Sequence, residues 1–169
     1  MEDHLRRLGA GPLHPFATWK RDAGVPHTAM GVYTIWWHTD HRPAHAGPGP
    51  FVYVGIAGCK AKAKPDESTP RRKGLWDRLR AHALGRRSGD QFSVYVADRI
   101  ILPMLTPEEL EAVAAAAGTV SIDRRVRSYV AEHLAFRWVE TPDAEITREI
   151  EVMIRRGQWE HSRPFLNPM

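Results

Sequence analysis

The clearest pattern along the chain is a pair of apolar segments separated by a polar loop. Residues 32–37 are β-branched or aromatic throughout, which is typical of a buried strand. Residues 38–50 are rich in proline and glycine, and residues 51–54 then predict a second strand that ends at Gly55. Two strands joined in this way predict an antiparallel hairpin. The loop is too long to specify the register of that hairpin.

Helical periodicity dominates the rest of the chain. Apolar residues three to four apart predict helices over residues 74–85 and about 121–134. The capping-box pattern at residues 106–109 predicts the start of an alanine-rich helix that ends near Gly118. A last helix begins at residues 141–143 and turns Ile146, Ile150 and Met153 or Ile154 inward.

Two further segments have strand character. Residues 92–96 alternate in polarity and predict a third strand, and residues 136–139 favour a short additional one. We therefore expect an α/β (α+β) fold with a small, mainly antiparallel, three-stranded sheet flanked by helices. Its expected organisation is an N-terminal arm over residues 1–27, followed by a domain over residues 28–169 with a basic loop at about 59–74 and a helical insertion at about 98–135.

Composition narrows the class of protein. The chain has 169 residues, of which 43% are hydrophobic, so a globular domain is expected. Cys59 is the single cysteine, which excludes an intrachain disulfide and a cysteine-rich zinc site. The apolar runs are far shorter than the roughly 20 residues that span a bilayer. We expect a soluble, cytoplasmic protein with no membrane partner.

The positive charge is concentrated in one segment. The formal net charge is +4, and the sequence pI is about 9.5. Residues 59–74 carry six cations against two carboxylates, so this segment accounts for the whole net charge. A local cluster of cations is typical of a surface that binds nucleic acid. A solvated basic loop without a partner remains the alternative.

An ordered set of motifs resembles the GIY-YIG nuclease superfamily. The paired tripeptides are Gly31-Val32-Tyr33 and Tyr53-Val54-Gly55. The features that follow, in the family's order, are Arg78 and His82 on the next helix, Glu151 on a C-terminal helix, and Pro164-Phe165-Leu166-Asn167 near the end. The basic segment before Leu75 and the forty or so residues before the last helix depart from the family pattern.

The resemblance implies a nuclease that uses Mg²⁺ or Mn²⁺ and one metal ion to hydrolyse phosphodiester bonds, with DNA as the expected substrate. It assigns catalytic roles to Tyr33, Tyr53, Arg78, His82 and Glu151, and the metal to Glu151. Gly31, Gly55 and Asn167 are the expected structural residues of the motif. We expect the contacts to nucleic acid from Lys60, Lys62, Lys64, Arg71, Arg72, Lys73 and Arg80.

The residue types suit this chemistry. In the family pattern Tyr33 is the general base, and Arg78 can hold two phosphate oxygens at once. His82 lies four residues after Arg78, on the same helix face. Glu151 is sufficient to anchor one hard cation whose other ligands are water and phosphate. Helical periodicity does not separate Glu151 from Glu149, and only the family's pattern of flanking apolar residues favours Glu151.

Each assignment has a plainer interpretation that the sequence leaves open. In that interpretation the tyrosines are ordinary strand residues without a catalytic role, and Arg78 is a surface cation beside Asp77. Glu151 is then one member of a solvated ion pair. The alternatives for the whole chain are a non-catalytic nucleic-acid-binding module on the same fold and an enzyme that has recruited the fold for other chemistry. A homodimer is a further expectation.

Overall fold

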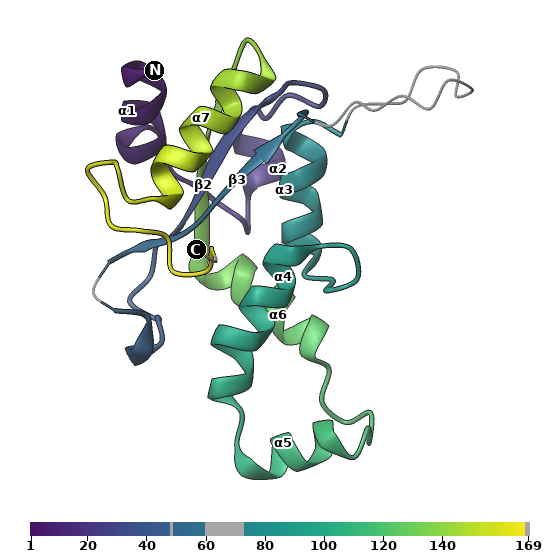
Figure 1. The fold of residues 1–169 in the computed structure, drawn as a ribbon. Coiled ribbons are helices and arrows are strands. Elements are labelled where there is room, and N and C mark those ends of the chain that lie inside the picture. Colours follow the sequence, from purple (N-terminus) through teal and green to yellow (C-terminus); the bar gives the residue numbers. More distant parts are fainter. Residues whose placement is uncertain (48, 60–72, 168–169) are drawn as a thin grey trace.

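The structure is a computed structural model, and it describes residues 1–47, 49–59 and 73–167. These residues form an α+β fold with a four-stranded antiparallel sheet and seven α-helices (Figure 1). The strands are β1 (His14–Pro15), β2 (Gly31–Trp37), β3 (Phe51–Ala57) and β4 (Leu134–Glu140). The helices are α1 (Glu2–Ala10), α2 (Trp19–Asp22), α3 (Leu75–Leu84), α4 (Gln91–Val96), α5 (Pro107–Ala114), α6 (Ile122–His133) and α7 (Ala144–Arg155).

The sheet has the strand order β1-β4-β2-β3, and all three neighbouring pairs are antiparallel. The predicted hairpin is therefore confirmed, with Tyr33 of β2 opposite Gly55 of β3. On its other side β2 pairs with β4, where Tyr33 lies opposite Trp138. The expected number of three strands is wrong by one, because the two-residue strand β1 of the N-terminal arm adds to the edge of β4.

The strand predicted over residues 92–96 is wrong. This segment is helix α4, which continues through a π-helical turn over Ala97–Ile101. Phe92 and Val96 are both fully buried, and a spacing of four residues places them on one helix face. A five-residue alternation fits this helical spacing as well as it fits a strand. The strand that pairs with β2 on this side is instead β4. It includes the short strand expected over residues 136–139 and is longer than expected at both ends.

Helices cover both faces of the sheet. On one face, α1 and α7 pack against β2 through Val32 and Trp36, together with Ile150 and Ile154 of α7. On the other face, Tyr33, Ile35 and Trp37 of β2 join a larger core with residues of α2, α3, α4 and α6. Figure 1 shows β2 and β3 running between α7 and α3. All seven residues of β2 are consequently buried, which explains its unbroken apolar sequence.

The ends of the helices follow the predicted signals. Helix α3 stops at Gly85, whose φ of 61° lies in the left-handed region that suits glycine. Helix α5 begins with the expected reciprocal capping box between Thr106 and Glu109. At the start of α7, the Asp143 carboxylate accepts hydrogen bonds from the backbone N–H groups of Glu145 and Ile146. These local interactions fix where each helix enters the fold.

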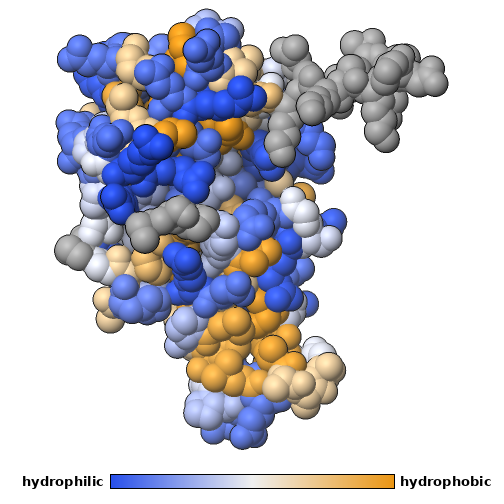
Figure 2. Space-filling view, viewed as in Figure 1, coloured by the Kyte–Doolittle hydropathy of each residue, from blue (hydrophilic) through white to orange (hydrophobic). Residues whose placement is uncertain are grey.

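The larger core also draws on residues outside the hairpin region. Phe16 and Trp19 of residues 1–27 are buried in it, as are Val126 and Val130 of α6. The lobe around α5 extends away from the sheet (Figure 1), and Figure 2 shows an apolar patch between the hydrophilic far end of this lobe and the rest of the molecule. Among the residues described, no helix combines the length and the apolar character needed to cross a membrane.

The C-terminal segment closes part of the free edge of β3. Backbone N–H groups of Phe165 and Leu166 donate to the carbonyls of Phe51 and Val52. The side chain of Asn167 then accepts from the Val54 N–H at 2.8 Å and donates to the Val54 carbonyl at 2.9 Å. Its amide thus takes the place of a partner strand for one residue and covers an edge that would otherwise stay unpaired.

We expect Asn167→Ala to lower the free energy of unfolding by about 1–2 kcal/mol, because both backbone groups of Val54 lose their partner. Asn167→Asp should cost more, since a carboxylate accepts from the N–H group but repels the carbonyl oxygen. Urea denaturation of the two variants checks this order. An aspartate variant as stable as the wild type would contradict the conclusion that the Asn167 side chain bonds both the N–H group and the carbonyl of Val54.

Candidate active site

A pocket of about 140 Å³ opens at the free edge of β3, just beyond the residue held by Asn167. Strands β2 and β3, helices α3, α4 and α7, and the residue before α4 all contribute to its wall. The lining residues are Tyr33, Tyr53, Gly55, Ile56, Arg78, His82, Asp90, Gln91, Phe92 and Glu151. Residues up to 118 positions apart in the sequence, from Tyr33 to Glu151, therefore meet around one small volume.

The missing side chain of Gly55 makes room for the phenol of Tyr33. A Cβ atom at Gly55 would lie 2.2 Å from the Tyr33 hydroxyl and 2.4 Å from its Cζ atom, inside van der Waals contact. The phenol and the backbone of Gly55 come this close because Tyr33 and Gly55 lie directly opposite each other on the paired strands β2 and β3. Gly31 is likewise close-packed, because its Cβ would lie 2.1 Å from the carbonyl oxygen of Val139 on β4. Both motif glycines thus allow close backbone approach.

A chain of buried hydrogen bonds runs from the phenol of Tyr33 into the protein. The Tyr33 hydroxyl lies 2.7 Å from Nε2 of His82, and Nδ1 of the same ring lies 2.9 Å and 3.0 Å from the two carboxylate oxygens of Asp90. The hydroxyl of Ser93 donates to Asp90 at 2.6 Å. Tyr33, His82, Asp90 and Ser93 are each no more than 4% exposed, so solvent does not compete for these bonds.

Burial and hydrogen bonding together determine the protonation states of the residues in this hydrogen-bond chain. Burial, with the nearby Tyr53, raises the pKa of Tyr33 well above that of an ordinary phenol. Burial likewise raises the pKa of Tyr53 to about 12. Burial also acts to raise the pKa of Asp90, but the electrostatic interaction and hydrogen bond with His82, together with hydrogen bonds from Ser93, outweigh it and lower that pKa below the ordinary value. At neutral pH both tyrosines keep their protons, and Asp90 is ionised.

Arg78 brings a positive charge to the pocket from α3. Its guanidinium is half-buried, and within residues 1–47, 49–59 and 73–167 no carboxylate pairs with it, not even its neighbour Asp77. Arg78 lines the same pocket as Tyr33 and Tyr53, and its charge acts to lower the pKa values of both phenols against the larger effect of burial. An arginine in this position can bind an anion that enters the pocket.

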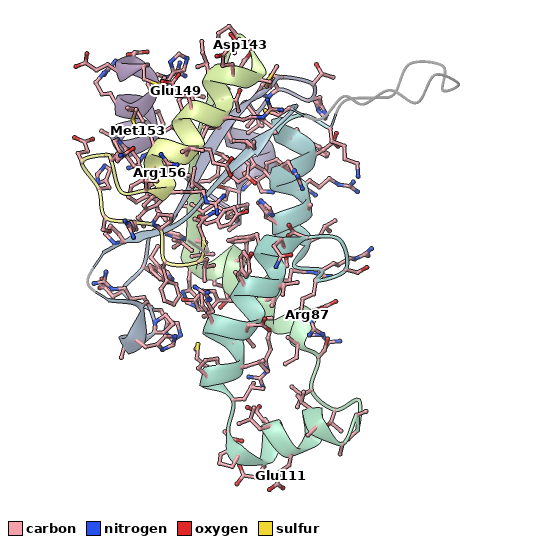
Figure 3. The ribbon with its side chains drawn as sticks, viewed as in Figure 1. Arg87, Glu111, Asp143, Glu149, Met153 and Arg156 are labelled. Carbon is pink, nitrogen blue, oxygen red and sulfur yellow. The ribbon has the colours of Figure 1, made fainter. Side chains whose placement is uncertain are left out.

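The structure separates the two candidate glutamates of α7. Glu151 is half-buried and lines the pocket, whereas Glu149 is exposed and does not. Figure 3 labels Glu149, Met153 and Arg156 along α7, and their spacing of four and three residues places them on one side of the helix. Glu151 lies about 200° around the helix axis from Glu149 and therefore points to a different side.

The comparisons with models of known families, with curated proteins and with solved structures found no match to this chain. The assignment of a function therefore depends on the chemistry of the pocket itself.

Of the two carboxylates that line the pocket among the described residues, Asp90 and Glu151, only Glu151 stays available for a ligand. Burial raises its pKa above the ordinary glutamate value, and the charge of Arg155, 4.0 Å away, offsets this only in part. Asp90 is already occupied by His82 and Ser93. Within the described part of the chain no group of three or more metal-binding side chains occurs. One carboxylate fits Mg²⁺ or Mn²⁺ held mainly by water and substrate phosphate, and it does not fit a metal held by protein ligands alone.

The residues expected to contact nucleic acid lie elsewhere or outside the described part. Lys60, Lys62, Lys64, Arg71 and Arg72 fall outside the residues that the structure describes. Lys73 is exposed, and its carbonyl accepts from the N–H of Gly58 just after β3. Arg80 is also exposed, but it does not line the pocket. It lines a separate groove of about 540 Å³, and the other cations there are Lys20, Arg21 and Arg127.

Asp90 and Ser93, which complete the hydrogen-bond chain, are not among the site residues predicted from the sequence. Asp90 precedes α4, and Ser93 lies in its first turn. An aspartate directly before a segment is a signal of a helix N-terminus, and Asp90 in that role would have favoured a helix over the predicted strand. No sequence pattern indicates that the carboxylate faces His82, because that contact depends on the turn between α3 and α4.

We expect Glu151→Gln to stabilise the ligand-free protein at neutral pH. A raised folded-state pKa means that stability is fully present below the unfolded pKa and is lost as the pH rises through the folded pKa. Glutamine removes that cost, so the variant should melt at a higher temperature than the wild type at pH 7 and at the same temperature near pH 3.5.

Thermal melts at both pH values test this expectation, with the exposed Glu149→Gln as the matched control that should change little at either pH. A Glu151→Gln variant that melts below the wild type at pH 7 in metal-free buffer would contradict the electrostatic account of this carboxylate.

Proposed function

We propose that this protein is a nuclease of the GIY-YIG type that hydrolyses phosphodiester bonds, with DNA as substrate and Mg²⁺ or Mn²⁺ as cofactor. The observation that carries the proposal is the convergence of Tyr33, Tyr53, Arg78, His82 and Glu151 in one pocket. These are the five residues to which the resemblance assigns catalysis, and they come from four different elements. The antiparallel sheet with helices on both faces supports the same assignment.

The pocket contains the groups that such a reaction needs. Arg78 binds two oxygens of the scissile phosphate and stabilises the negative charge that develops on them. Tyr33 takes a proton from the attacking water, and Tyr53 lines the pocket beside it with a ring-centre separation of 6.4 Å. Glu151 holds the divalent cation, which supplies positive charge to the phosphate when bound.

The central test is cleavage of supercoiled plasmid, single-stranded DNA and RNA by the purified full chain, each with Mg²⁺, Mn²⁺ or EDTA. We expect metal-dependent cleavage of DNA. Glu151→Gln, Tyr33→Phe and Arg78→Lys should each lower kcat by about 100-fold or more, because each removes a group that acts on the transition state.

Three matched variants control for general effects of substitution. Glu149→Gln and Tyr95→Phe alter residues outside the pocket, and Arg124→Lys alters an exposed cation of α6, so all three should cleave at close to the wild-type rate. If nucleic acid binds but no metal supports cleavage, the chain is a binding module on this fold. If RNA alone is cleaved, the substrate assignment is wrong.

The basic loop provides a separate prediction about binding. If the six cations between residues 60 and 73 contact phosphates of duplex DNA, replacing all six with serine should lower the slope of log K against log salt by up to about five units. Fluorescence anisotropy over a salt series, with Glu151→Gln in both proteins to prevent cleavage, measures the slope. An unchanged slope would show that the loop does not contact the bound duplex.

A further inference from the structure

Asp90 lies behind the proposed catalytic pair and has no role in the function proposed above. Its carboxylate is buried, ionised and directed at the histidine that contacts Tyr33. We propose that Asp90 is a positioning residue: it fixes His82 in the tautomer with a proton on Nδ1 and none on Nε2, so that His82 accepts the proton of Tyr33. This inference rests on the proposed function for its role in catalysis, but its structural part stands by itself.

The first step of the argument is the direction of each hydrogen bond. A carboxylate has no proton to donate, so Nδ1 of His82 must donate to Asp90 at 2.9–3.0 Å. A neutral imidazole carries one proton, and the opposite nitrogen, Nε2, therefore presents a lone pair. The hydroxyl of Tyr33, 2.7 Å from Nε2, then donates into that lone pair.

The second step is that the ring has no alternative orientation. Ser93 donates to one oxygen of Asp90 at 2.6 Å, and this bond holds the carboxylate in place beside Nδ1 of His82. The ring of Phe92 packs beside that of His82 with a centre separation of 4.6 Å, and His82 shares the core face of α3 with Leu75 and Leu79. Turning the ring over by 180° would place Cδ2 where Nδ1 now faces Asp90 and Cε1 where Nε2 now faces Tyr33, so both hydrogen bonds would be lost.

The third step concerns the proton of Tyr33. A phenol that keeps its proton at neutral pH cannot take a proton from water until it gives up its own. In the relay that the geometry allows, water loses a proton to the Tyr33 oxygen while the Tyr33 proton moves to Nε2 of His82. The oxygen of that water forms the new bond to phosphorus, and the leaving oxygen departs with the electron pair of the broken bond. The imidazolium then lies against the negative charge of Asp90.

The test combines a spectroscopic and a kinetic readout on the full-length chain. Two-bond ¹H–¹⁵N correlation spectra of protein labelled with ¹⁵N-histidine distinguish a protonated ring nitrogen from a bare one. His82→Gln assigns the signal of His82 among the nine histidines. We expect the wild type at pH 8 to show a proton on Nδ1 and none on Nε2.

Asp90→Asn should shift His82 toward the opposite tautomer, because the asparagine amide can donate to Nδ1. We expect kcat to fall by a factor of about 100 to 10,000 while KM changes less than threefold. Asp90→Glu, which keeps the charge, should retain the wild-type tautomer and recover part of the rate. The exposed Asp123→Asn, whose carboxylate pairs with Arg87, is the matched control and should change neither readout.

Failure of the role assigned to Asp90 can be distinguished from failure of the proposed nuclease function. A wild-type His82 with its proton on Nε2 overturns the proposal even if Asp90→Asn fails to fold. A folded Asp90→Asn with the wild-type tautomer, or with kcat within threefold of the wild type, also overturns it. If the wild type cleaves no nucleic acid, the proposed function fails, and the spectra still decide whether Asp90 sets the tautomer.

Discussion

Burial of β2 on both of its faces is the constraint on which the rest of the structure depends. A strand without an exposed residue needs a partner strand on each side and a helical layer above and below. Strands β3 and β4 supply the partners, and α1 with α7 and α3 with α6 supply the layers. Because β3 is the outer strand of this arrangement, groups from both layers reach its edge, and the pocket forms there.

Two carboxylates in this pocket have opposite electrostatic environments. Asp90 is held ionised by His82 and Ser93, and its pKa is lowered. Glu151 is surrounded by less compensating charge, and its pKa is raised. Carboxylates whose pKa values are driven apart typically have different tasks in an active site. Asp90 already forms hydrogen bonds to His82 and Ser93, whereas the charge of Glu151 would be stabilised by a cation that arrives with a ligand. This difference is consistent with the roles proposed for the two residues.

The sequence predicted the features that local pattern controls. The hairpin, the end of α3 at Gly85 and the capping box of α5 each depend on residues adjacent in the chain, and the structure confirms them. The strand assigned to residues 92–96 failed because five residues are too few to separate a period of two from one of 3.6. The choice of β4 as the neighbour of β2 depends on packing over a hundred residues and has no local signal.

For the candidate site, the sequence indicated which residue types to examine but not their arrangement. Nothing in the pattern around Glu149 and Glu151 decides between them without the resemblance, and the structure separates them because α7 has one fixed orientation on β3. The contact between His82 and Asp90 depends on the path of the turn between their helices. Such a contact is a property of the folded chain and not of any sequence window.

The close approach of Tyr33 to Gly55 limits the order in which these two positions can change during evolution. A residue larger than glycine at position 55 is incompatible with the phenol, since its Cβ would overlap the ring. A lineage that first loses the tyrosine is then free to accept alanine at position 55. After that second step, restoring the tyrosine alone is harmful, so the loss becomes difficult to reverse. The two positions therefore behave as a single inherited unit, even though 21 residues separate them in the chain.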